Sequence, residues 1–187
     1  MATAKRTEVR VRELTFVSFI GEEELRVRVE ELGAALREKL GDASTPTFLV
    51  MLNGAFIFAA DLVRASRLAG EIAFVRTKSY AGTASTGEVR VLLAPEPALI
   101  RDRDVILVED IVDSGYTMQA FLPRLRELGP RSVTLVTLLH KPTATQVAIP
   151  IDLVGFSIPD RFVVGYGLDY NGHGRQLPAI YQLAQDY

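Results

Sequence analysis

The feature that most constrains this chain is a set of apolar runs that are too short to be helices. Phe48–Leu52 and Val105–Val108 are apolar at every position. Helices in globular proteins usually span more residues, and a strand with one exposed face alternates polar and apolar residues. Each run therefore predicts a strand buried on both faces, which is typical of a parallel sheet covered by helices.

The segments between these runs favour helices. Apolar residues recur at helical spacing from Leu25 to Leu40, three glutamates precede them, and Gly41 ends the pattern. Further helices are predicted over Ala55–Arg67 and Thr117–Leu128, and further strands over Ile72–Tyr80, Val89–Leu93, Ser132–Leu139, Asp152–Phe156 and Phe162–Tyr166. This alternation predicts an α/β fold with a mostly parallel central sheet flanked by helices, whose ligands bind beyond the carboxyl ends of the strands.

Length and composition exclude several classes of protein. The chain has 187 residues, a formal charge of −2 and no cysteine. The slight negative charge argues against a nucleic-acid partner, and the lack of cysteine excludes disulfides and thiolate zinc sites. Residues 1–12 are charged rather than apolar, and the longest apolar stretches are much shorter than a membrane span. We expect a single-domain, soluble, cytoplasmic protein with no membrane partner.

The most informative segment follows the apolar run that begins at Val105. It runs into Glu109 and Asp110, and a short loop, Asp113–Thr117, then leads into a helix. Free amides and the dipole at a helix N-terminus favour a phosphate there. The paired carboxylates would repel a phosphate, so we expect them to face sugar hydroxyls or a divalent cation.

A structural role for the same loop stays open. Asp113 or Ser114 has the residue type that caps helices. Capping does not account for two further acids at the end of an apolar strand. The loop is not a Walker loop, because the glycine-rich run and its Gly-Lys-Ser/Thr ending are missing.

The segment Val105–Met118 resembles the motif with which type I phosphoribosyltransferases bind phosphoribosyl pyrophosphate (PRPP). Other segments look like the hypoxanthine-guanine members of that family: Lys78–Tyr80, Leu139–Pro142 and Val154–Tyr170. The similarity runs from about Phe48 to Pro178, in the order of the family. It implies the type I fold, with a core of about residues 45–150 and a small hood formed by the N-terminal segment and about residues 151–187.

The resemblance implies roles for the PRPP-binding segment. Glu109 and Asp110 would hold the ribose hydroxyls, and Asp113 would be the general base for N7 of the purine. The 5′-phosphate would lie in the loop formed by Asp113, Ser114, Gly115, Tyr116 and Thr117. Tyr116 itself occupies a variable position of the family and is given no chemical role.

On the purine side, the resemblance implies that Lys141 contacts O6, that Phe162 stacks on the base and that Val163 reads the base edge through its backbone. Asp169, close to the purine, would be a magnesium ligand, together with Glu109 and Asp110. Arg175 would meet the departing pyrophosphate. Mg²⁺ is the implied cofactor.

Two further segments are implied to act on the pyrophosphate or to cover the site. Ser79 and Tyr80 match the start of a mobile loop that closes over the site and excludes water. Asn53 and Gly54 form the pyrophosphate turn, where the family commonly has Lys-Gly and a non-proline cis peptide bond. Between Asp169 and Arg175 the bulkier family residues are replaced by Asn171–Gly174, and we expect His173 to face solvent.

We expect an enzyme that converts PRPP and hypoxanthine or guanine to IMP or GMP, and a homodimer or homotetramer. Three alternatives remain. The first is a xanthine-preferring phosphoribosyltransferase, since the purine-side residues do not rank the 6-oxopurines. The second is a regulator of the same fold that binds PRPP or a nucleotide. The third is a bare nucleotide-binding module, which would leave the paired acids and Asp113 without a joint role.

Overall fold

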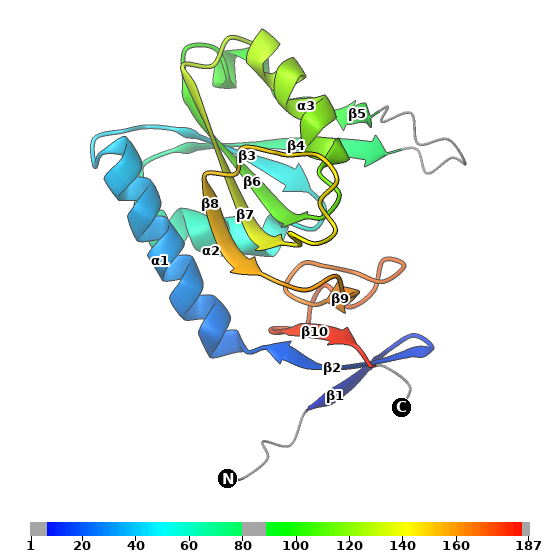
Figure 1. Ribbon diagram of the computed structural model, residues 1–187. Coiled ribbons are helices and arrows are strands. Elements are labelled where there is room, and N and C mark those ends of the chain that lie inside the picture. Colours follow the sequence, from blue (N-terminus) through cyan, green and yellow to red (C-terminus); the bar gives the residue numbers. More distant parts are fainter. Residues whose placement is uncertain (1–6, 80–88, 185–187) are drawn as a thin grey trace.

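The main sheet of the protein has six strands in the order β5-β4-β3-β6-β7-β8, as seen in a computed structural model that describes residues 7–79 and 89–184 (Figure 1). The strands are β3 (Thr47–Leu52), β4 (Glu71–Ser79), β5 (Val89–Leu93), β6 (Asp104–Val112), β7 (Ser132–His140) and β8 (Leu153–Ser157). All neighbours pair in parallel except β5, which runs antiparallel to β4. The predicted α/β fold with a mostly parallel sheet is confirmed.

Helices cover both faces of this sheet (Figure 1). α1 (Glu22–Leu40) and α2 (Phe56–Ser66) pack on one face, and α3 (Tyr116–Glu127) packs on the other. Successive residues of β3 point to opposite faces, so Val50 joins the cluster under α1 and α2 whereas Leu49 joins the cluster under α3. Burial on both faces explains why the strand is apolar at every position.

A second sheet of four antiparallel strands, in the order β1-β2-β10-β9, lies beyond the carboxyl end of β8 (Figure 1). Its strands are β1 (Glu8–Val11), β2 (Leu14–Ile20), β9 (Val163–Val164) and β10 (Ile180–Leu183). The small cluster beneath it includes Val11, Phe16 and Val164. The residue boundaries of core and hood stay a prediction.

Three of the differences between the structure and the predicted elements have a clear physical reason. β6 continues past Val108 to Val112, because β7 still pairs with it after the pairing with β3 has ended. The strand predicted over Phe162–Tyr166 is cut to two residues, because Gly165, Tyr166 and Gly167 have positive φ angles. β10 was not predicted, since its four residues are a strand only through their pairing with distant β2 and β9.

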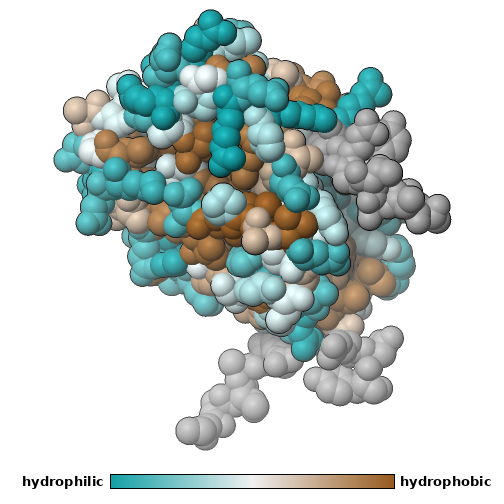
Figure 2. All heavy atoms as spheres, turned by 45° about the horizontal axis from the view of Figure 1, so that its top comes forward, coloured by the Kyte–Doolittle hydropathy of each residue, from teal (hydrophilic) through white to brown (hydrophobic). Residues whose placement is uncertain are grey.

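Figure 2 shows that hydrophobic side chains reach the surface in the middle of the face that it presents, bordered by hydrophilic ones. Within the described residues, no helix is long and apolar enough to cross a bilayer. The large apolar side chains that remain exposed include Phe56, Ile72 and Phe74.

The two-sided burial of the main sheet gives a stability prediction. Val136→Ala in β7 removes two methyl groups from a side chain with 0% exposure, which should lower the free energy of unfolding by about 2–3 kcal/mol through lost burial and the cavity left behind. Val27→Ala on α1 makes the same change at a side chain that is 41% exposed. Urea denaturation should show a loss of less than about 0.5 kcal/mol for this control, and equal losses would contradict the assigned core.

Candidate active site

The loop Asp113–Gly115 joins β6 to α3 and brings the N-terminus of the helix to the carboxyl edge of the sheet. Gly115 precedes the helix with a φ of 89°, and no side chain caps the helix. The first amides of α3 have no partner within the helix, and the helix dipole gives this end a partial positive charge. The capping alternative for Asp113 and Ser114 is therefore not observed, and the uncapped end can receive an anion.

Glu109 and Asp110 lie side by side in the last part of β6. Burial raises the pKa of Glu109 well above its usual value, and the adjacent charge of Asp110 raises it further. Burial also raises the pKa of Asp110, although the hydrogen bond from Glu109, the bond of its Oδ1 with the Ile111 amide and the charge of Arg175 act in the opposite direction. The Oε2 atom of Glu109 is buried and has no hydrogen-bond partner within the protein, so its hydrogen-bonding capacity is unused.

The turn after β3 packs closely against the side chain of Asp110. The peptide bond between Leu52 and Asn53 is cis, as the family resemblance implied. A Cβ atom added to Gly54 would lie 1.5 Å from Oδ2 of Asp110. A side chain at this position would therefore have to displace the carboxylate of Asp110.

Lys141 is held between two aspartates. Its Nζ atom donates to Oδ2 of Asp113 at 2.8 Å and to Oδ1 of Asp160 at 3.1 Å, and its side chain is 8% exposed. Burial acts to lower the pKa of Lys141, but the bonds and charges of Asp113 and Asp160 outweigh it and raise the pKa. The lysine is therefore a protonated donor at neutral pH. Asp160 was not singled out from the sequence, where it is only one acid in a surface loop.

Asp169 and Arg175 form a second pair. Nη2 of Arg175 lies 2.6 Å from Oδ1 of Asp169, and its Nη1 donates to the carbonyl of Gly167 at 2.6 Å. The other carboxylate oxygen of Asp169 accepts a hydrogen bond from the Gly172 amide at 2.6 Å. Gly167, which bonds Arg175, packs against Gly54, and Gly54 packs against Asp110, so this pair and the acids of β6 belong to one cluster.

The remaining predicted residues are distributed as follows. Phe162 is 45% exposed, and its ring centroid lies 5.9 Å from that of Tyr170. Val163 is buried in β9. The phenol of Tyr116 donates to Gln146 at 3.0 Å, and His173 is exposed and bonded to Arg12. Tyr80 lies outside the described residues, and Ser79 is the last residue of β4, so the expected mobile loop stays a prediction.

The residues present fit a magnesium ion that is shared with a substrate. Magnesium usually takes one or two carboxylates and completes its shell with substrate oxygens and water. Within residues 7–79 and 89–184 no group of three acidic or histidine side chains is arranged to hold a metal alone. The unpartnered oxygen of Glu109 is one hard oxygen donor for such sharing, and the carboxylate of Asp169, whose oxygens contact Arg175 and the Gly172 amide, would be another.

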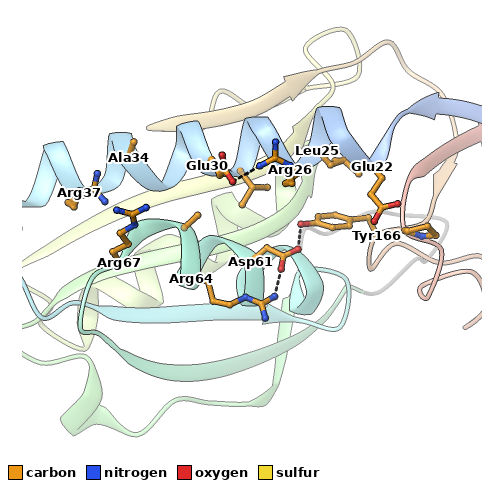
Figure 3. A pocket seen from close by; sticks show the side chains of 13 residues that line it. Glu22, Leu25, Arg26, Glu30, Ala34, Arg37, Asp61, Arg64, Arg67 and Tyr166 are labelled. Atoms are coloured by element: carbon orange, nitrogen blue, oxygen red, sulfur yellow. Dashed lines mark hydrogen bonds and ion pairs between the residues drawn. The ribbon is translucent and has the colours of Figure 1, made fainter.

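A groove of about 660 Å³ lies elsewhere, between α1 and α2 (Figure 3). Arginines and acids line it, among them Arg26, Arg64 and Asp61, and Tyr166 closes one end. None of the predicted site residues lines this groove. The chemistry-bearing side chains are instead gathered at the carboxyl edge of the main sheet.

Comparison with known proteins agrees with this geometry. Residues 22–171 match the phosphoribosyl transferase domain. The chain is 43% identical over 168 residues to the hypoxanthine phosphoribosyltransferase of Buchnera aphidicola, which covers 89% of this chain and 94% of the relative. It is 40% identical over 162 residues to the hypoxanthine-guanine phosphoribosyltransferase of Bacillus subtilis, with 86% and 89% covered. A crystal structure of a hypoxanthine-guanine phosphoribosyltransferase from Bacillus anthracis superposes with a TM-score of 0.85 at 35% identity, covering 89% of this chain and 98% of the other.

The raised pKa of Glu109 predicts how stability depends on pH. A buried acid whose folded pKa exceeds its unfolded value, about 4.3, opposes folding at any pH above the folded pKa, and this opposition disappears as the pH falls towards the unfolded pKa. Glu109→Gln keeps a donor for Asp110 and removes the titration. It should raise the thermal unfolding midpoint at pH 8, and the gain should shrink towards pH 4.

Thermal unfolding followed by circular dichroism between pH 4 and pH 8.5 measures this difference. Glu38→Gln changes an exposed glutamate of α1 and serves as the control, whose effect should not change with pH in this way. A Glu109→Gln variant that is less stable than the wild type at pH 8 would contradict the cost assigned to this buried carboxyl.

Proposed function

The chain belongs to the phosphoribosyltransferase family, and we propose that it is a purine salvage enzyme that transfers the 5-phosphoribosyl group of PRPP to N9 of hypoxanthine or guanine. The products are IMP or GMP and pyrophosphate. The observation that carries the proposal is the uncapped N-terminus of α3 next to the paired acids of β6. This edge of the sheet offers a phosphate subsite and a hydroxyl subsite side by side.

The two subsites bind different parts of PRPP, the 5′-phosphate and the ribose hydroxyls. The amides of residues 115–117 and the hydroxyls of Ser114 and Thr117 bind the 5′-phosphate, because a helix N-terminus stabilises an anion. Glu109 and Asp110 accept hydrogen bonds from the ribose hydroxyls. The free Oε2 of Glu109 supports this role, since a sugar hydroxyl would satisfy it.

Lys141 favours a 6-oxopurine. A protonated lysine carries only donors, so it pairs with the O6 acceptor of hypoxanthine, guanine or xanthine and opposes the 6-amino group of adenine. The raised pKa of Lys141 and its place between Asp113 and Asp160 support this assignment. The half-exposed ring of Phe162 offers a stacking surface, and the backbone of Val163 reads the edge of the base.

Asp113 acts as the general base. As N9 bonds to C1 of the ribose, the C1–oxygen bond to pyrophosphate breaks, and the carboxylate of Asp113 takes the proton from N7. Its side chain is 47% exposed and accepts a hydrogen bond from Lys141, so it is accessible to the purine and oriented by the lysine. A correctly positioned base contributes about 10²–10⁴-fold to the rate.

The leaving pyrophosphate meets Arg175 and the turn formed by Asn53 and Gly54. The guanidinium is suited to bind phosphate oxygens through two donors, and it must exchange its contact with Asp169 for the substrate. Asp169, with Glu109 and Asp110, would hold Mg²⁺, which when bound neutralises charge on the pyrophosphate. Asn53 offers a neutral amide where the family commonly has a lysine.

Self-association and a cytoplasmic location complete the proposal. Ile72 and Phe74 point to the same face of β4, opposite to buried Ala73, and are 49% and 45% exposed. Exposed neighbouring apolar side chains of this size are typical of a subunit interface, so we propose a homodimer or homotetramer. A cytoplasmic location fits a chain without cysteine.

The assay that tests the activity supplies PRPP and magnesium with hypoxanthine, guanine, xanthine or adenine in turn, and follows nucleotide formation by absorbance. We expect metal-dependent turnover of hypoxanthine or guanine and none of adenine. Asp113→Asn should lower kcat by about 10²–10⁴-fold. Asp160→Asn removes the other charged partner of Lys141 but leaves the base Asp113 in place, so kcat of this variant should fall much less.

The outcomes of this assay separate the alternatives. Preferential turnover of xanthine would identify the xanthine-preferring enzyme. Binding of PRPP in calorimetry without turnover of any base would overturn the catalytic proposal in favour of a regulator of the same fold.

Sedimentation velocity tests the proposed oligomer. The wild type should sediment as a dimer or tetramer, and Phe74→Asp should shift it towards the monomer because the charge loses hydration on burial. Glu38→Asp, a change at an exposed position of α1, is the control. A wild type that sediments as a monomer at micromolar concentration would contradict the proposed oligomer but not the proposed activity.

A further inference from the structure

A tight turn of unusual backbone geometry stands between β9 and the Asp169–Arg175 pair. Gly165, Tyr166 and Gly167 have φ angles of 101°, 49° and 103°. A positive φ is uncommon for a residue with a side chain, and a bulky residue keeps it only when its surroundings hold it there. Contacts of Tyr166 with its surroundings must therefore hold this backbone conformation.

The side chain of Tyr166 is anchored on α2. Its phenol donates to Oδ2 of Asp61 at 2.5 Å, while Arg64 donates to the other carboxylate oxygen (Figure 3). The residue is 7% exposed. Burial and the bond to Asp61 raise the pKa of Tyr166, so the phenol stays a hydrogen-bond donor throughout the neutral range.

The backbone of the same turn holds the arginine assigned to pyrophosphate. The carbonyl of Gly167 accepts from Nη1 of Arg175 at 2.6 Å, and the Gly167 amide donates to the carbonyl of Arg175 at 3.0 Å. Arg175 in turn pairs with Asp169. Any displacement of Gly167 is therefore passed directly to Arg175.

The turn also touches the other half of the pyrophosphate subsite. A Cβ atom on Gly167 would lie 2.1 Å from the carbonyl oxygen of Gly54. α2, which carries Asp61, begins two residues after Gly54, at Phe56. The segment from Gly54 into α2 and the turn Gly165–Gly167 therefore meet at two points. One is the contact between Gly54 and Gly167, and the other is the hydrogen bond between Tyr166 and Asp61.

We propose that Tyr166 and Asp61 are positioning residues for the pyrophosphate subsite: their hydrogen bond fixes the turn at Gly165–Gly167 against Gly54 and so holds Arg175 in register with the Asn53–Gly54 turn. This inference rests on the proposed function for the identity of the ligand. Neither side chain acts on the substrate itself. The pair acts through Gly167 and Arg175.

Steady-state kinetics of Tyr166→Phe tests the proposal, because this change removes only the hydroxyl group. The KM for PRPP should rise roughly five- to tenfold, in line with the net contribution of a typical intramolecular hydrogen bond. The KM for hypoxanthine and kcat should stay within about twofold. Tyr181→Phe removes the hydroxyl of a tyrosine that is similarly buried, at 8% exposure in β10, and should leave the KM for PRPP unchanged.

Variants of Asp61 supply the rescue and a test that does not change the tyrosine. Asp61→Asn keeps an oxygen acceptor for the phenol and should preserve the KM for PRPP, whereas Asp61→Ala should reproduce the effect of Tyr166→Phe. The double variant Tyr166→Phe/Asp61→Ala should be no worse than either single variant, because both remove one interaction. Additive losses, or an equal loss in Asp61→Asn, would overturn the proposal.

Hydrogen exchange followed by mass spectrometry gives a readout that does not depend on turnover. Amides of the peptide that spans Gly165–Leu177 should exchange faster in Tyr166→Phe than in the wild type or in Tyr181→Phe. Faster exchange in a protein without transferase activity would refute the proposed function and leave the positioning role standing. Unchanged exchange, or equal rises of both KM values in Tyr166→Phe, would overturn the positioning role.

Discussion

The arrangement of the candidate site depends on one steric constraint, the absence of side chains at Gly54 and Gly167. A Cβ atom on Gly54 would overlap the carboxylate of Asp110, and one on Gly167 would overlap the carbonyl oxygen of Gly54. Three segments far apart in the sequence, at the ends of β3 and β6 and in the turn after β9, therefore approach within contact distance. Asp110 and Arg175, both assigned to PRPP, lie at this meeting point, so a larger residue at either glycine would disturb their arrangement.

The charges around this point are arranged in three separate environments. Glu109 and Asp110 lie together and are partly buried, and burial raises the pKa of both carboxyl groups. Asp113 is half-exposed and stabilised by Lys141, and Asp169 is paired with Arg175. Carboxyl groups of similar chemistry therefore stand in different surroundings, which matches the different roles proposed for them as hydroxyl acceptors, a general base and a metal ligand.

Much of the fold and part of the site were predictable from local sequence. Continuous apolar runs such as Phe48–Leu52 predicted buried strands because burial on both faces leaves no position for a polar residue. The loop Asp113–Thr117 was recognisable because its residues are consecutive and follow a strand. β10 was not predicted, because a segment of four residues is too short for an alternating pattern to distinguish it from a loop. It is a strand only through its pairing with β2 and β9.

The sequence by itself determined the α/β class, the family and the local motif proposed to bind the phosphate, because these depend on periodicity and on neighbouring residues. Only the tertiary structure decided the partners of the charged groups: Lys141 between Asp113 and Asp160, Arg175 on Asp169, and Tyr166 on Asp61. These partners are separated by 6 to 105 positions in the chain. Such contacts follow from the crossing of the chain at the carboxyl edge of the sheet, and no local pattern of residues records which side chains that crossing brings together.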